Sequence, residues 1–117
     1  MLDKDNIFFK KKILIYGLGK SGISAYRFLK KNNKIYLYDD NKIKNQNLEI
    51  KKKLIQYQDI IHEKIDCIII SPGIDIKKCR LKNFLKKNHG KIHTDLDVFY
   101  YYYKKNKNIT ITGTNGK

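Results

Sequence analysis

The chain of 117 residues carries 26 Lys and Arg against 11 Asp and Glu, so its formal net charge is +15. This length allows one domain with a modest core, and no apolar run approaches the ~20 residues that cross a bilayer. The first residues, "MLDKDNIFFKKK", lack the order of charge and hydrophobicity of a secretory signal. We therefore expect a cytoplasmic monomer rather than a membrane-bound or secreted protein.

The first third of the chain alternates strand and helix. Lys11–Gly17 is a short apolar run that ends in glycine, which is typical of a buried strand. Residues 20–33 place apolar side chains at helical spacing, with lysines in the last turn and asparagines as the stop. Lys34–Asp40 predicts a second strand that ends in two acids.

The middle of the chain is less regular. Residues 41–47 are polar and predict a loop. Residues 48–55 are compatible with a helix, and a short edge strand over residues 54–57 is an open alternative. Residues 64–73 contain the clearest buried strand, and the Pro72–Gly73 pair forces a turn at its end.

Two further helices are predicted after this turn. Residues 79–90 indicate a helix with Gly90 as its C-terminal cap, and the following "KIH" is a brief strand. Residues 94–105 indicate a helix that begins at a capping pair of Thr94 and Asp97.

Strands and helices that alternate at these lengths imply parallel strands joined by right-handed crossovers. We therefore predict an α/β, Rossmann-like parallel sheet with flanking helices over residues 1–106. Residues 107–117, with the strand "NITIT", are predicted to begin a second, ATP-binding domain. Ligands of such sheets bind beyond the carboxyl ends of the strands. Four unusual loops follow predicted strands and should share that rim: Gly17–Gly22, Asp39–Asn41, Ser71–Gly73 and Gly113–Lys117.

The first of these loops, "GLGKSG", matches the pattern GxGxxG between a strand and a helix. Gly17 permits a tight turn, Gly19 lets the backbone approach a phosphate, and Gly22 lets the helix pack close to the strand. The start of the helix offers free N–H groups to a diphosphate, and Ser21 can add a hydroxyl. Asp39 follows Gly19 by 20 residues, where a carboxylate accepts hydrogen bonds from a ribose. On these residues alone the ligand would be NAD.

The turn "SPGI" at the end of the most apolar strand is the second candidate site. Ser71 offers a hydroxyl, Pro72 stiffens the turn, and Gly73 offers an unhindered N–H. We expect contact with the same ligand because this turn faces the glycine loop. An ordinary turn without a ligand is the alternative.

The third candidate is "TGTNGK" at residues 112–117. Backbone N–H groups of such a loop surround phosphates, and the lysine reaches the β- and γ-phosphates of a nucleoside triphosphate. The full pattern has Ser or Thr after the lysine to hold magnesium, and that position does not exist here. The spacing is also shorter than that of the general motif. We expect a truncated gene product that lacks its second domain, and a flexible tail is the alternative.

Lysines supply most of the positive charge, since only Arg27 and Arg80 are arginine. Runs such as Lys10–Lys12 and Lys51–Lys53 are spread along the chain, whereas proteins that read nucleic acids favour arginine. We interpret the lysines as a solvated surface and expect no nucleic-acid partner. A lysine-rich nucleic-acid-binding module is the alternative, and the aromatic run Phe99–Tyr103 could then stack on bases. Core packing and contact with a second domain are the preferred roles of that run.

The two cysteines and three histidines indicate neither a disulfide nor a metal site. Cys67 and Cys79 are isolated thiols, and Cys67 in its apolar run is predicted to be a buried core residue. The histidines share no ligand spacing, so we expect solvated or capping roles for them: His62, His89 and His93.

Taken together, "ILIYGLGKSGIS", "YLYDD", "IIISPGI", "TDLDVF" and "ITITGTNGK" resemble the amino-terminal region of the Mur ligases, in order along nearly the whole chain. The similarity is greatest to the D-glutamate-adding members. The resemblance implies a role in peptidoglycan precursor synthesis, in which ATP and Mg²⁺ activate the carboxylate of UDP-N-acetylmuramoyl-L-alanine and the amine of D-glutamate attacks it. This chain would be the UDP-sugar-binding domain and the start of the ATP-binding domain. No catalytic set is complete in it, so we expect it to be inactive alone and to bind the UDP-sugar weakly.

Carried over by position, the resemblance implies that Lys20 and Ser21 lie beside the diphosphate and Asp39 lies near the uridine. Family members often have a hydroxyl residue and a basic residue where this chain has Asp40 and Asn41, so its uracil contacts should differ. The implied UDP-sugar contacts are Gly17, Gly19, Lys20, Ser21, Gly22, Asp39, Asp40, Ser71, Pro72 and Gly73, and the implied ATP contacts are Gly113, Thr114, Asn115, Gly116 and Lys117. An NAD(P)-binding Rossmann domain of an oxidoreductase or sensor is the main alternative. GxGxxG and Asp39 support it, whereas "SPGI" and "TGTNGK" do not.

Overall fold

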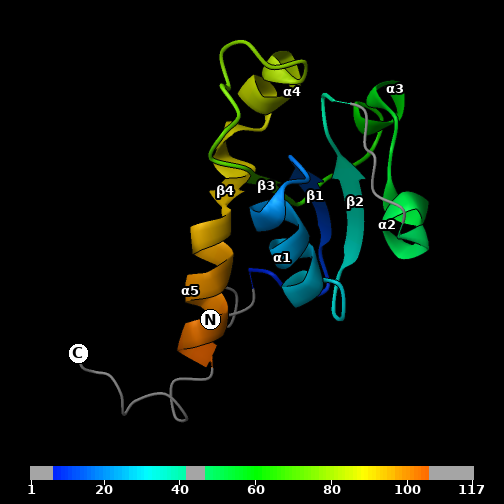
Figure 1. Ribbon diagram of the computed structural model, residues 1–117. Helices are drawn as coiled ribbons and strands as arrows, with labels where there is room; N and C mark the ends of the chain where they lie inside the picture. Colours follow the sequence, from blue (N-terminus) through cyan, green and yellow to red (C-terminus); the bar gives the residue numbers. More distant parts are fainter. Residues whose placement is uncertain (1–6, 42–46, 106–117) are drawn as a thin grey trace.

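A computed structural model defines residues 7–41 and 47–105 of the protein (Figure 1). Its four strands form one parallel sheet in the order β2-β1-β3-β4. The strands are β1 (Lys12–Tyr16), β2 (Lys34–Tyr38), β3 (Cys67–Ile70) and β4 (Ile92–Thr94). The predicted α/β class with a parallel, Rossmann-like sheet is confirmed. The predicted strand at 108–112 and the loop at 113–117 lie outside the described residues.

The sheet is apolar on both faces because helices cover both. Ile15 of β1 lies opposite Leu37 of β2 and Ile69 of β3 in the register, and all four residues of β3 are buried. Parallel strands that are buried on both faces form continuous runs of apolar residues rather than alternating ones. This is why the sequence signal for β1 and β3 is strong.

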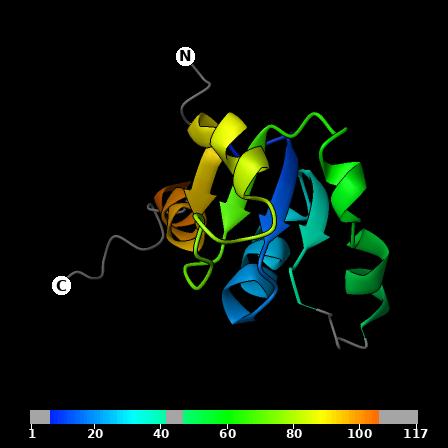
Figure 2. The ribbon, with the colours of Figure 1, turned by 90° about the horizontal axis from the view of Figure 1, so that it is seen from above.

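Two hydrophobic cores lie on opposite faces of the sheet (Figure 2). Helices α1 (Lys20–Leu29) and α5 (Asp95–Lys105) lie side by side over one face, and they contribute Ala25, Tyr26, Leu29, Val98 and Tyr101 to its core. Helices α3 (Tyr57–Ile60) and α4 (Lys82–Lys87) cover the other face, where Ile60, Leu81 and Leu85 pack against the sheet.

Helix α1 ends at Leu29, four residues before the predicted end at Asn33, although the Asn33 side chain does cap it. The Asn33 side chain donates from Nδ2 to the carbonyl oxygens of Leu29 and Phe8 at 2.9 and 2.8 Å. Its Oδ1 accepts from the N–H of Lys11 at 2.9 Å. One amide side chain thus satisfies a helix end and fixes the chain that enters β1.

The segment after β2 contains the predicted helix, whereas the alternative edge strand over residues 54–57 is reduced to one bridge at Leu54. Helix α2 (Leu48–Lys53) starts at Asn47, whose Oδ1 accepts from the N–H groups of Glu49 and Ile50. Leu54 then forms a single parallel bridge with Leu37. The short helix α3 that follows was not predicted, because four residues with one buried side chain give too short a pattern to detect.

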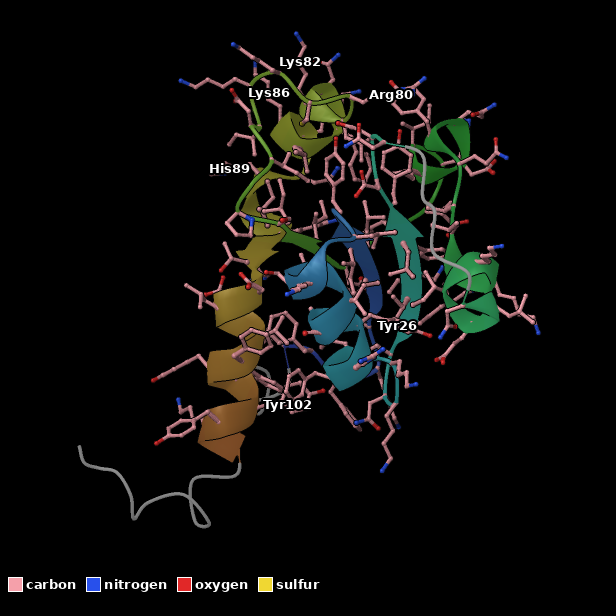
Figure 3. The ribbon with its side chains drawn as sticks, viewed as in Figure 1. Tyr26, Arg80, Lys82, Lys86, His89 and Tyr102 are labelled. Atoms are coloured by element: carbon pink, nitrogen blue, oxygen red, sulfur yellow. The ribbon has the colours of Figure 1, made fainter. Side chains whose placement is uncertain are left out.

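Side-chain contacts to Glu49 hold α2 against α1. The Tyr26 hydroxyl donates to Glu49 at 2.6 Å, and the Lys30 ammonium lies 2.9 Å from the same carboxylate oxygen. Burial, and then the hydrogen bond to Glu49, raise the pKa of Tyr26 to about 12. Tyr26, which lies on α1 and is labelled in Figure 3, therefore stays a neutral donor at physiological pH.

The predicted end of the fourth helix was wrong. Helix α4 stops at Lys87 and not at Gly90, because Asn88 takes up its last carbonyl groups. The Asn88 backbone and side-chain N–H groups both donate to Phe84, at 3.1 and 2.8 Å. Gly90 lies in a separate 3₁₀ turn, η2 (His89–Lys91), and its φ is not positive.

Helix α5 begins with the predicted capping pair. The N–H of Thr94 donates to Asp97 Oδ2 at 2.9 Å, and the N–H of Asp97 donates to Thr94 Oγ1 at 3.4 Å. Its aromatic run is divided between core and surface, as a run that circles the helix must be. Tyr101 is buried, whereas Tyr100 and Tyr103 are 66% and 55% exposed.

The solvated or capping role expected for His93 was also wrong. Its ring is half-buried on β4 and packs edge-on against Phe8, with the ring centroids 5.1 Å apart. Burial lowers the pKa of His93 more than nearby Asp97 raises it. Cys67 is buried as predicted, and burial raises its thiol pKa to about 11, so the thiol stays protonated.

Candidate functional site

The loops after β1, β2 and β3 meet at the carboxyl edge of the sheet. Backbone hydrogen bonds continue the strand pairing into them: Gly17 N–H donates to the Tyr38 carbonyl at 2.9 Å, and Ser71 N–H donates to the Tyr16 carbonyl at 3.0 Å. Three of the four loops predicted to share a rim therefore do so. The fourth, Gly113–Lys117, lies outside the described residues.

Gly17 holds the glycine loop against the serine turn. Its φ is +101°, a conformation that side chains other than glycine rarely adopt. A Cβ at this position would lie 2.6 Å from the Cβ of Ser71 and 2.9 Å from the Cδ1 of Ile74. The "GLGKSG" loop and the "SPGI" turn are thus in direct contact, as the sequence predicted.

The other two glycines of the motif differ from each other in their surroundings. A Cβ at Gly22 would lie 1.9 Å from the carbonyl oxygen of Gly17, so helix α1 packs against the turn that precedes it. A Cβ at Gly19 would meet nothing within 4 Å. Gly17 and Gly22 therefore have structural roles, whereas the space over Gly19 is open to a ligand.

Helix α1 starts at this open space. Gly19 is its N-cap, so no side chain caps the helix, and its first turn contains no acid. The first hydrogen bond of the helix runs from the N–H of Ile23 to the Gly19 carbonyl at 3.0 Å. The N–H groups that come before Ile23 in the first turn therefore have no acceptor within the helix. Lys20 is exposed and Ser21 is half-buried beside them. A helix start of this kind favours an anion.

Asp39 connects the loop after β2 to the glycine loop. Its Oδ2 accepts from the N–H of Leu18 at 2.7 Å, and its Oδ1 accepts from the N–H of Asn41 at 2.9 Å. The carboxylate therefore orders both loops. The hydrogen bond from a ribose hydroxyl to Asp39 stays a prediction.

Asp40 makes an unexpected connection at the same edge. The buried Tyr16 hydroxyl lies 2.7 and 2.8 Å from its two carboxylate oxygens, and the N–H of Arg80 donates to it at 3.2 Å. The Tyr16 oxygen also accepts the N–H of Leu81 at 3.4 Å. Burial, and then the bond to Asp40, raise the pKa of Tyr16 above its usual range. Asp40 thus ties the ends of β1 and β2 to the segment before α4.

Arg80 lies at the same end of the molecule, between α3 and α4 (Figure 3). Its guanidinium group is 5.4 Å from the centroid of the Tyr57 ring. It also acts on Tyr38, whose pKa is raised by burial and partly lowered by the arginine charge. A guanidinium over an aromatic ring is a favourable contact, and here it attaches α3 to the edge of the site.

A pocket of about 280 Å³ opens between the loop after β2 and the segment after the serine turn. Asp39–Asn41 line one side, and Gly73–Asp75 with Lys78 and Cys79 line the other. Sequence reasoning missed Tyr16, Lys78 and Arg80. For Tyr16 there was a signal: a tyrosine ends an otherwise aliphatic strand, and a buried hydroxyl needs a partner.

We expect Tyr16→Phe to lower the free energy of unfolding by about 1 to 3 kcal/mol, because the change leaves the N–H of Leu81 without its acceptor and removes the hydroxyl that donates to Asp40. Urea denaturation followed by circular dichroism measures this. Tyr100→Phe, on the exposed side of α5, is the matched control and should change the stability little. Equal midpoints for the two variants would contradict the structural role of the Tyr16 hydroxyl.

Neither a metal centre nor a membrane span is present in the part of the chain that the structure describes. No three His, Cys, Asp or Glu residues among residues 7–41 and 47–105 gather closely enough to hold a metal ion. Over the same residues, each helix is too short or too polar to span a bilayer.

Residues 11–92 match the sequence profile described as "Mur ligase MurD-like, N-terminal domain". The chain is 36% identical over 111 residues to UDP-N-acetylmuramoylalanine--D-glutamate ligase of Rickettsia conorii, an alignment that covers 92% of this chain and 22% of that protein. It is 38% identical over 121 residues to the ligase of the same name from Lachnoclostridium phytofermentans, with 94% and 26% covered. The chain thus spans about a quarter of the length of these relatives.

A solved structure of UDP-D-quinovosamine 4-dehydrogenase from Vibrio fischeri is similar to this fold, with a TM-score of 0.46 and 18% identity. The similarity covers 73% of this chain and 75% of that one. At this level it carries no argument about function.

Proposed function

Since the chain belongs to the Mur ligase MurD-like N-terminal domain family, we propose that its rim of loops binds the UDP end of a UDP-N-acetylmuramoyl-amino acid. The longer proteins that it resembles are named as D-glutamate ligases of this substrate class. The chain would supply the substrate-binding part of such a ligase. We propose binding rather than catalysis for this chain, because the described residues include no complete catalytic set.

The open space over Gly19 is the observation that carries the proposal. Two glycines of the motif are required by neighbouring atoms, and the third leaves the start of α1 accessible. A diphosphate placed there would receive first-turn N–H groups and the positive end of the helix. Lys20 and Ser21 directly follow Gly19 in the sequence, so Lys20 would bring an ammonium group to the diphosphate.

The serine turn supports the same position from β3. Ser71 packs against Gly17, and a Cβ on Gly73 would meet no atom within 4 Å. Ser71, Pro72 and Gly73 therefore border the glycine loop with a hydroxyl and an unhindered backbone. The uridine would extend from the diphosphate toward Asp39 and Asp40, in the pocket after β2.

The remaining chemistry belongs to the proposed longer ligase. There the substrate carboxylate would take a phosphoryl group from ATP, and the amine of D-glutamate would displace phosphate to form an amide. Gly113–Lys117 would hold ATP phosphates, which rests on the sequence of that loop alone. Mg²⁺, when bound, would neutralise charge on the transferring group. We expect the 117-residue chain by itself to bind the substrate without forming the amide.

Titration with UDP, NAD and a short DNA duplex tests the proposal against both alternatives. At about 150 mM salt, where surface charges are screened, we expect UDP to shift backbone NMR signals of Gly19–Gly22 and Ser71–Gly73. NAD binding without UDP binding would contradict the ligase assignment and favour an oxidoreductase. DNA binding with a steep dependence on salt would favour the nucleic-acid module.

A further inference from the structure

The pocket after β2 contains three carboxylates and one ammonium group among its lining residues. Asp39, Asp40 and Asp75 contribute the carboxylates, and Lys78 contributes the ammonium. The sum of these formal charges is negative, so this pocket is a poor position for a phosphate. The start of helix α1 is a better position for the phosphate. The pocket therefore suits an uncharged part of a nucleotide.

The carboxylates already have hydrogen-bond partners within the protein. Asp39 accepts from Leu18 and Asn41, and Asp40 accepts from Tyr16 and Arg80. Asp75 Oδ1 accepts from the N–H of Lys77 at 2.9 Å. These groups set the shape of the pocket. They are positioning residues for the two loops that form its walls.

Asn41 and Lys78 are the two lining side chains with strong hydrogen-bond donors that could distinguish one base from another. The amide of Asn41 both donates and accepts hydrogen bonds, so it can pair with a carbonyl or an amino group. The ammonium of Lys78 can only donate. Lys78 is exposed on the segment after the serine turn. Its N–H donates to the Asp75 carbonyl at 3.0 Å, and its neighbour Cys79 is buried. The backbone that carries this ammonium is therefore fixed at the pocket.

We propose that Lys78 determines which base the pocket accepts, by donating a hydrogen bond to the carbonyl oxygen at position 4 of a pyrimidine. Uracil presents a carbonyl oxygen where cytosine presents an amino group, so Lys78 favours uracil and disfavours cytosine. This inference rests on the proposed function, because it assumes that a nucleotide diphosphate lies on the glycine loop.

Isothermal titration or NMR titration of the 117-residue chain with UDP and with CDP tests this inference. We expect the wild type to prefer UDP by about tenfold, the range of a hydrogen bond to a charged group at an exposed site. Lys78→Gln should remove most of this preference, since glutamine both donates and accepts. Lys77→Gln removes the same charge from the adjacent residue, which does not line this pocket. It should lower both affinities slightly and keep the preference.

The ratio of the two affinities separates base selection from general electrostatics, since the loss of one charge affects UDP and CDP alike. Circular dichroism spectra of both variants check that the fold is retained, as expected for exposed lysines. A wild type that binds UDP and CDP equally, or a Lys78→Gln variant that keeps the preference, would overturn the role of Lys78 while the proposed function stands. A wild type that binds neither nucleotide would overturn the proposed function and this inference together.

Discussion

Replacing Gly22 with alanine should lower the free energy of unfolding by about 3 kcal/mol or more, and the variant should be largely unfolded if the domain is only marginally stable. The added Cβ would lie 1.9 Å from the carbonyl oxygen of Gly17 and 3.0 Å from its carbon. Both are backbone atoms of a turn that also contacts Ser71. Neither the turn nor helix α1 can move without disrupting the pairing of β1 with β3.

Urea denaturation followed by circular dichroism measures the effect of this substitution. Gly90→Ala is the matched control, because a Cβ at that position would meet no atom within 4 Å and its φ is not positive. We expect that variant to unfold at nearly the same urea concentration as the wild type. A Gly22→Ala variant with an unchanged midpoint would show that α1 does not pack against the glycine turn as described.

Gly19→Ala should leave the stability of the fold nearly unchanged and lower the affinity for the ligand. Nothing lies within 4 Å of the added Cβ, and an N-cap change from glycine to alanine costs about 1 kcal/mol or less. The methyl group would, however, occupy the space through which a diphosphate reaches the start of α1. We expect the affinity for UDP to fall at least about tenfold.

NMR titration with UDP measures this affinity, and urea denaturation of the same sample measures the stability. Ser24→Ala, on the exposed side of α1, is a suitable control for a small change on the same helix. A Gly19→Ala variant that binds UDP as tightly as the wild type would place the diphosphate elsewhere on the molecule. A variant that unfolds would instead show that the space over Gly19 is needed by the chain itself.

The sequence predicts the sheet well because the central strands are buried on both faces. Apolar runs such as "CIII" in β3 leave few other interpretations, and glycine in the GxGxxG spacing locates the turn between β1 and α1. The end of α1 is also predictable, since asparagine is a common helix stop and Asn33 acts as one. These features depend on residues that are close together in the sequence.

Several features were missed, and they include a local competition between two helix caps and contacts between distant residues. Gly90 is a common type of helix cap, but Asn88 satisfies the carbonyl groups of α4 first, and only the structure shows that competition. The bonds of Asp40 to Tyr16 and Arg80 join positions 24 and 40 residues apart. The sequence predicted Asp40 as a ligand contact and gave no sign of its bonds to Tyr16 and Arg80. Lys78 was one lysine among many until the structure placed it in the lining of the same pocket as Asn41.

The bond between the Leu18 N–H and Asp39 has a consequence for the cost of binding. Together with the two strand-like bonds of Gly17 and Ser71, it holds the described residues at the start of each of the three loops in place before any ligand arrives. Such preorganisation spares the conformational entropy that a mobile loop loses when it closes on a ligand. Affinity at this rim should therefore reflect the direct contacts of the nucleotide, with little contribution from ordering of the backbone.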